Sequence, residues 1–205
     1  MPQISDRAIA ELIYHLGRIV QGEGFVAGLT PAHWTALRYF TRANRFSRTV
    51  SAFADFHATT RGTASQTVKS LVTQGYLTRI RSTKDGRSAS LDVTAKGHGA
   101  LADDPFKSLV RAVGDVPPGG RRHLATSLER VLGQVASERG RRPFGSCPAC
   151  QHLEGEGSGR LRQAPYACGL MAASLSEQEL GEICVNFEPG NTSVMRRARR
   201  PGSPP

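Results

Sequence analysis

The first 146 residues of this 205-residue chain contain no cysteine, and all four cysteines lie beyond them. Aromatic residues are also scarce, at 6% of the chain with one tryptophan. No run approaches the ~20 consecutive apolar residues that a membrane-spanning helix needs, so we expect no membrane span. The N-terminus has no basic stretch followed by an apolar one, and we therefore expect no secretory signal and a cytoplasmic location.

Acidic residues are too few to balance the basic ones. The chain has 17 Asp and Glu against 27 Lys and Arg, which gives a net charge of +10 at pH 7 and a pI of about 10.2. Such a surplus of cations favours a polyanionic partner, nucleic acid first and an anionic membrane surface second. The length and the hydrophobic content of 39% suit one globular domain with an appendage.

The side-chain groupings that enzymes need are missing too. We find no paired catalytic carboxylates, no glycine motif for nucleotides and no nucleophile beside a base. Asp103-Asp104 is the only acidic pair, and we attribute it to charge on a helix surface. We therefore expect that the protein is not an enzyme. An oxidoreductase or electron carrier that uses the cysteines is the competing class, and it would need a substrate pocket.

The segment from Ser47 to Thr94 carries the clearest pattern, which predicts a helix, a turn, a second helix and a hairpin. We expect helices over 47–54 and 63–74, strands over 76–80 and 90–93, and a tight turn over 84–87. Ser47 is the expected cap of the first helix. Gly75 should end the second helix in a left-handed conformation.

The polar face of that second helix carries short donors and acceptors with one cation: Thr63, Ser65, Gln66, Lys69 and Ser70. Hydroxyl and amide groups of this reach suit base edges in a major groove. Arg79 and Arg81 precede the hairpin tip and Arg87 lies in it, where an arginine can enter a minor groove. The competing interpretation is an ordinary solvated face, since such patterns are short and common.

Several of these residues resemble the winged helix of the MarR family of bacterial transcription regulators. The matching residues are Thr63-Ala64-Ser65, Leu71, Gly75-Tyr76-Leu77, Asp85-Gly86-Arg87 and Leu91-Asp92-Val93-Thr94, and the run from Leu29 to Phe40 resembles the second helix of the family. The likeness extends over roughly residues 5–140. It implies a mainly α fold with a small β-hairpin wing, acting on double-stranded DNA. The candidate DNA-binding residues are Arg45, Thr60, Arg61, Thr63, Ser65, Gln66, Lys69, Arg79, Arg81 and Arg87.

Helical patterns flank the winged segment. Residues 5–22 carry an apolar stripe behind a Ser5 cap, and Thr30-Pro31 opens a further helix. After Thr94 we expect one helical stretch interrupted near Asp104-Pro105, a break over 116–120, and a last helix through about Ser137. This last helix has little left to cover it, so we expect a homodimer, whose two-fold symmetry would match a pseudo-palindromic operator.

Composition divides the chain into five parts. They are an N-terminal dimerisation helix (1–28), a winged helix-turn-helix domain (29–97), C-terminal dimerisation helices (98–140), a cysteine-rich metal- or cluster-binding segment (141–191) and a disordered basic tail (192–205).

The cysteines are spaced C-x2-C-x17-C-x15-C, as Cys147, Cys150, Cys168 and Cys184. Their segment is too poor in apolar residues to fold on a core of its own, and a bound metal would supply the missing stability. One close pair with two dispersed cysteines favours an iron–sulfur cluster. The alternatives are structural zinc, which a zinc ribbon would bind with a second close pair, and a thiol–disulfide switch or no metal.

Two further observations bear on the cysteine segment. His152 is close enough to replace a cysteine as ligand. Tyr166-x-Cys168-Gly-Leu170 and the final Cys184 resemble the cysteine-bearing C-terminal extension of some MarR-like actinobacterial proteins, and a short helix is expected behind a cap at Ser174 or Ser176.

These patterns leave two regulatory hypotheses. In the first, a homodimeric DNA-binding regulator responds to the redox or iron state of a four-cysteine cluster, which orders or loosens the dimerisation helices. In the second, a small organic ligand between the dimer helices and the winged helix is the signal, and the cysteines hold structural zinc.

Overall fold

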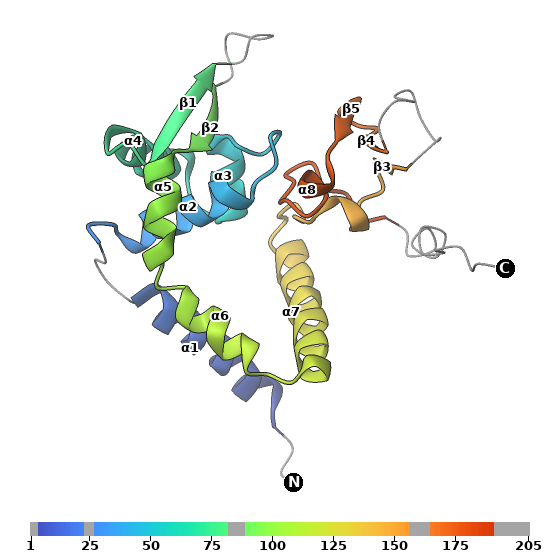
Figure 1. Cartoon of the computed structure of the whole chain (residues 1–205). Coiled ribbons are helices and arrows are strands. Elements are labelled where there is room, and N and C mark those ends of the chain that lie inside the picture. Colours follow the sequence, from blue (N-terminus) through green and yellow to red (C-terminus); the bar gives the residue numbers. More distant parts are fainter. Residues whose placement is uncertain (1–3, 23–26, 82–88, 156–164, 191–205) are drawn as a thin grey trace, which may run out of the picture.

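The computed structural model describes residues 4–22, 27–81, 89–155 and 165–190, and Figure 1 shows their arrangement. The α-helices are α1 (Asp6–Gly22), α2 (Pro31–Arg42), α3 (Val50–Phe56), α4 (Arg61–Thr73), α5 (Ala95–Ala100), α6 (Lys107–Gly114), α7 (Pro118–Glu138) and α8 (Glu177–Leu180). The strands are β1 (Leu77–Arg81), β2 (Ala89–Val93), β3 (Leu153–Glu154), β4 (Tyr166–Cys168) and β5 (Ala173–Leu175). No described helix is long and apolar enough to cross a membrane.

Helix α2 lies at the centre of the hydrophobic core, and it begins where the sequence predicted. The Thr30 hydroxyl accepts a hydrogen bond from the His33 amide at 3.2 Å, and His33 Nδ1 accepts one from the Thr30 amide. Pro31 fits the first position because its missing N–H is not needed there. The buried residues of α2 are Trp34, Ala36, Leu37, Tyr39 and Phe40. They give the helix-turn-helix a rigid base.

The first helix of the helix-turn-helix starts later than predicted. Helix α3 begins at Val50, and its cap is Thr49, whose hydroxyl accepts from the Ala52 amide at 3.1 Å. Ser47 was expected to cap this helix, and that prediction is wrong. Its side chain is fully buried, and its hydroxyl lies 2.7 Å from the Asn44 amide oxygen.

The second helix starts two residues earlier than predicted because Thr60 caps it. The Thr60 hydroxyl accepts a hydrogen bond from the Thr63 amide at 3.1 Å, so the helical turn begins at Arg61. Its far end is as expected, since Gly75 follows with a φ of +77°, a conformation that costs glycine little.

Strands β1 and β2 form the predicted antiparallel hairpin, with Leu77 opposite Val93 and Arg81 opposite Ala89. Leu77 and Leu91 are buried and fix the hairpin against α2 and α4. The tight turn expected over 84–87 lies outside the described residues.

Helix α5, which follows the hairpin, was not predicted because two glycines break its pattern. Thr94 caps it by accepting from the Gly97 amide at 3.1 Å. A side chain at Gly97 would place Cβ only 2.4 Å from the Tyr76 carbonyl oxygen, so the helix can pack this closely on the wing only with glycine there.

The helices on either side of the winged domain leave their apolar residues in solvent. The break expected at Asp104-Pro105 is present, between a 3₁₀ turn and α6. The break expected over 116–120 is shorter, because Pro118 is the first residue of α7. Large exposed apolar side chains include Leu12, Ile13, Leu16 and Ile19 of α1, Val110 and Val113 of α6, and Leu124, Leu128, Val131, Leu132 and Val135 of α7. Figure 1 shows these helices at the end of the molecule opposite the wing.

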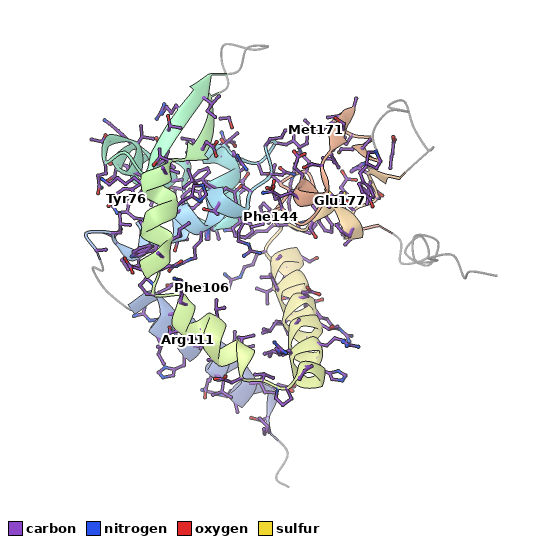
Figure 2. All side chains as sticks on the ribbon, in the orientation of Figure 1. Tyr76, Phe106, Arg111, Phe144, Met171 and Glu177 are labelled. Atoms are coloured by element: carbon purple, nitrogen blue, oxygen red, sulfur yellow. The ribbon has the colours of Figure 1, made fainter. Side chains whose placement is uncertain are left out.

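Residues 144–155 and 165–190 form what we call the cysteine lobe. It contains a small antiparallel sheet in the order β3-β4-β5, which was not predicted. Ser176 caps α8, as one of the two predicted alternatives, with Glu179 completing a capping box. Ile183 belongs to the core of the winged domain, and Phe144 packs against Phe56 with ring centroids 4.9 Å apart. Figure 2 shows Phe144 between the two parts.

Candidate functional site

The predicted polar face of α4 lies open to solvent. Its members Thr63, Ser65, Gln66 and Lys69 are all exposed, whereas Ala64, Val68 and Leu71 on the opposite side are fully buried. The buried side fixes the rotation of the helix about its axis. The hydroxyl, amide and ammonium groups are therefore presented together on an outer surface, next to the hairpin.

The first turn of α4 adds two more candidates. Thr60 and Arg61 are exposed, and the Thr60 hydroxyl lies 2.9 Å from that of Thr63. The N-terminal end of a helix is electropositive and attracts anions, and the Arg61 guanidinium adds to this charge.

The wing arginines are only partly described. Arg79 is exposed on β1. Arg81 ends β1, with its side chain outside the description, and Arg87 lies outside the described residues altogether.

Arg45, another candidate DNA-binding residue, contacts the cysteine lobe and not the polar face of α4. Its Nη1 is 3.2 Å from Glu179 Oε1, and its Nη2 donates to the Ser174 carbonyl oxygen. Both partners belong to the cysteine lobe. In this conformation the guanidinium of Arg45 is therefore occupied by the chain itself.

The four cysteines come together around one small cavity, the cysteine cavity, of about 10 Å³. Its lining is Asn44, Phe46, Cys147, Cys150, His152, Leu153, Cys168, Leu175, Cys184 and Asn186. Cys147 and Cys184 are each 8% exposed, and all four cysteines are free thiols. The sequence separation of 37 residues between the first and last cysteine is thus closed by the fold of the lobe.

The surroundings of the cavity keep Cys147 protonated as long as no cation is bound nearby. Burial, followed by the neighbouring sulfurs of Cys184, Cys150 and Cys168, raises the pKa of Cys147 to about 11. A thiolate is the form that binds metal, and a nearby cation lowers the pKa of its ligands. The donor set and its burial therefore fit a bound metal, which would supply the charge that the thiolates require.

The spacing of the donors is less favourable. Among the described residues, no group of three or more His, Cys, Asp or Glu side chains is arranged to hold a metal ion. A cavity of about 10 Å³ also has room for little more than one water-sized atom. The four expected ligands thus line one cavity, but in the described part of the chain they are not arranged as a metal-ion site.

His152 lines the same cavity, and its imidazole lies next to an acidic side chain. Its Nε2 lies 3.2 Å from Glu188 Oε2 but makes no hydrogen bond of good geometry there. A small rotation of the carboxylate would align the two groups. Glu188 is held in place by a hydrogen bond from the Gln151 side chain.

The segment that contains Cys184 is bonded directly to the loop before α3. The Ile183 amide donates to the Arg42 carbonyl oxygen at 2.7 Å, and the Ile183 carbonyl oxygen accepts from the Asn44 amide at 3.0 Å. The next residue but one, Val185, donates from its amide to the Ser47 hydroxyl at 2.8 Å. This junction could not be predicted from the sequence, since nothing local in either segment points to the other.

A larger cavity of about 450 Å³, the interhelix cavity, lies beside α4. Its lining is Arg18, Gln21, Pro31, Ala32, Thr35, Phe53, His57, Thr59, Thr63, Ala64 and Thr67. Its size is that of a site for a small organic molecule. It places the first turns of α4 in contact with anything that binds there.

Comparisons with known proteins agree on the winged part of the chain. Residues 27–88 match the sequence model of the MarR family, and the match ends before the first cysteine. No curated protein was found to be similar.

Solved structures show the same fold. A MarR/EmrR family transcriptional regulator from Acinetobacter sp. ADP1 aligns with a TM-score of 0.54 at 17% identity, over 65% of this chain and 99% of the other. MepR from S. aureus, in complex with DNA, aligns at 0.52 and 15% identity over 64% and 96%. A MarR transcriptional regulator from Methanosarcina mazei Go1 aligns at 0.50 and 25% identity over 64% and 95%. The matched family is one of transcription regulators and not of enzymes.

Proposed function

We propose, from the match of residues 27–88 to the MarR family, that the chain is a transcription regulator that binds double-stranded DNA in a sequence-specific manner. The observation that carries this proposal is the exposed polar face of α4 on a firmly buried apolar side. A helix so presented can place hydroxyl and amide groups against base edges. The net charge of +10 and the DNA complex of MepR, which has a similar fold, support it.

The proposed functional unit is a homodimer. Large exposed leucine, isoleucine and valine side chains recur on α1, α6 and α7, and exposed apolar surface of this kind marks an interaction site. A second copy would cover it and set the distance between two copies of α4. The site on DNA would then be pseudo-palindromic, with half-sites spaced by about one helical turn, ~34 Å.

The cysteine cavity is proposed to hold an iron–sulfur cluster through Cys147, Cys150, Cys168 and Cys184, with the redox or iron state of the cluster as the signal. Support comes from the position of all four thiols around one cavity and from the burial of Cys147 and Cys184. Among the described residues no three of these donors are arranged to hold a single metal ion, so the proposal rests on the donor set and on its position around one cavity. When bound, such a cluster supplies a charge that changes with oxidation state.

The first test is the visible absorption spectrum of anaerobically purified protein, with iron, sulfide and zinc measured on the same sample. Broad absorbance near roughly 400 nm with matching iron and sulfide is the expected result. A colourless protein with one zinc per chain would contradict the cluster. Each of four single Cys→Ser variants should lose the metal, whereas His152→Gln should keep it.

DNA binding is tested separately, by selection of bound sequences from a random duplex pool. Enrichment of an inverted repeat is expected. Binding without any enriched sequence would contradict sequence-specific recognition.

A second candidate signal is a small organic ligand, which the volume of the interhelix cavity favours. In that case the cysteines would hold structural zinc, a role that the small volume of the cysteine cavity suits better than a cluster. The metal analysis above separates the two candidates.

A further inference from the structure

Both terminal nitrogens of Arg45 bind the cysteine lobe. Nη1 lies 3.2 Å from Glu179 Oε1, and Nη2 donates to the carbonyl oxygen of Ser174. The side chain of Arg45 is nevertheless 47% exposed, so solvent and ions can reach it. A phosphate group would compete with the lobe for the same nitrogens.

The carboxylate of Glu179 is held ready for this contact. Its Oε2 accepts from the Ser176 amide at 2.9 Å and lies 3.0 Å from the Ser176 hydroxyl. The other oxygen faces Arg45, and only 16% of the Glu179 side chain is exposed. Because the cap of α8 orients the carboxylate, the ion pair costs little side-chain entropy to form, and it should be stronger than an ordinary surface pair.

A second acid of the lobe faces a second arginine of the same loop. Glu182 Oε1 lies 3.9 Å from Arg48 Nη2, and Arg48 also binds Asp92 of the wing strand β2 at 2.9 Å. The lobe therefore places negative charge along the entry to the helix-turn-helix. DNA phosphates and this acidic edge would attract the same cations.

The cysteine site lies on the segment that docks the lobe. Cys184 is between Ile183 and Val185, whose backbone groups bond to Arg42, Asn44 and Ser47. The hydrogen bonds on both sides of Cys184 therefore connect the cysteine site directly to the backbone on both sides of Arg45, along a route that does not include α7.

We propose that the docked cysteine lobe and DNA phosphate compete for Arg45, so that the cysteine site regulates DNA affinity by setting how firmly the lobe is docked. This rests on the proposed function as a DNA-binding regulator. It replaces the expected route through the dimerisation helices with direct contact at the helix-turn-helix.

The test compares Glu179→Gln with Glu177→Gln in the full chain. Glutamine can still complete a capping box, so the first variant loses the charge facing Arg45 and keeps α8. Glu177 is exposed on the same helix and carries no ion pair among the described residues, so its variant matches the change in net charge. Figure 2 shows Glu177 on the lobe.

The readout is the salt dependence of binding to one DNA duplex. Release of Arg45 should steepen the slope of log K against log salt by about 0.9 for each arginine that gains a phosphate. Over a fourfold drop in salt, the DNA affinity of Glu179→Gln should therefore rise by about threefold more than that of the wild type for each released arginine. Glu177→Gln should stay at the wild-type slope, and in an Arg45→Ala background the two glutamine variants should bind alike.

Equal slopes for the two glutamine variants would overturn the competition. A steeper slope that persists without Arg45 would overturn Arg45 as the released group. If neither the wild type nor any of the variants binds DNA, the proposed function fails together with this inference. That outcome is distinct from the first two.

Discussion

The guanidinium of Arg38, on α2, lies 2.8 Å from the carboxylate of Asp104, at the break before α6. Asp104 is 7% exposed and also accepts a hydrogen bond from the Phe106 amide, and Arg38 lies over the Phe106 ring at 4.9 Å. The sequence predicted helix-surface charge at Asp103-Asp104, and for Asp104 that prediction is wrong. The pair fixes the chain where it leaves the winged domain for α6.

Replacing Arg38 by methionine should therefore destabilise the protein. The variant leaves the Asp104 carboxylate buried with no cation beside it, which we expect to lower the free energy of unfolding by about 2 kcal/mol. Urea denaturation measures the change. The exposed pair of Arg7 and Glu11 is the control, since Arg7→Met should cost less than about 0.5 kcal/mol. Equal losses in the two variants would refute a special role for the Arg38–Asp104 pair.

Gln66 should read bases. It is exposed in the middle of the polar face of α4, and a glutamine amide can bind adenine with two hydrogen bonds. Gln66→Ala should change the preferred base at one position of each half-site, by about 1–3 kcal/mol of discrimination. A binding-site selection with both proteins measures this. Gln74→Ala, at the other end of the helix, is the control and should leave the selected sequence unchanged.

His57 should make stability depend on pH. Burial, followed by the charge of Arg38, lowers the pKa of His57 to about 4 from its ordinary value of 6.5. Below pH 6.5 the unfolded chain binds a proton that the folded chain refuses until about pH 4, so stability falls as the pH drops through this window and is unaffected above it. The loss should approach about 2 kcal/mol, since the ring is only partly buried.

The control for His57 is a phenylalanine variant. His57 packs edge-on against Phe53 and Phe56, and its Nε2 has no hydrogen-bond partner within the described structure. His57→Phe keeps the ring contacts and removes the titration. The denaturation midpoint should fall less between pH 7 and pH 4 in the variant than in the wild type. An equal fall in the two proteins would contradict the assignment to His57.

Leu12 should belong to the dimer interface. It lies on the apolar stripe of α1 with 66% of its surface exposed. Leu12→Glu would bury a charge in the interface and should dissociate the dimer into monomers, seen as a halved mass by sedimentation. Tyr14, which is 71% exposed and turned about 200° away at 100° per residue, is the matched control. Dissociation by both variants would place the interface elsewhere.

Local signals in the sequence were enough to predict several elements. Thr30-Pro31 predicted the start of α2, and the apolar spacing predicted α1 and α2. Helix α5 was missed because Gly97 and Gly99 hide it, and only its packing against Tyr76 explains them.

The residues of the candidate site could be predicted from the sequence, but the contacts between distant parts of the chain could not. The polar face of α4 follows from its periodicity, and the cysteines follow from their spacing. The contact of Glu179 with Arg45 could not be predicted, because the two residues are far apart in the chain and each has an ordinary local context. The same holds for Ser47, whose neighbours suggested a helix cap and whose hydroxyl accepts from Val185 instead.

Ile183 contributes to the core of the winged domain although it lies 86 residues beyond residue 97, where that domain ends. The cysteine lobe is therefore not a module that can be cut away cleanly. A chain shortened before Phe144 would uncover Ala43 and Phe56, both of which the lobe covers, and would leave the Ser47 hydroxyl without the Val185 amide. The winged domain without the lobe would therefore expose apolar surface at Ala43 and Phe56.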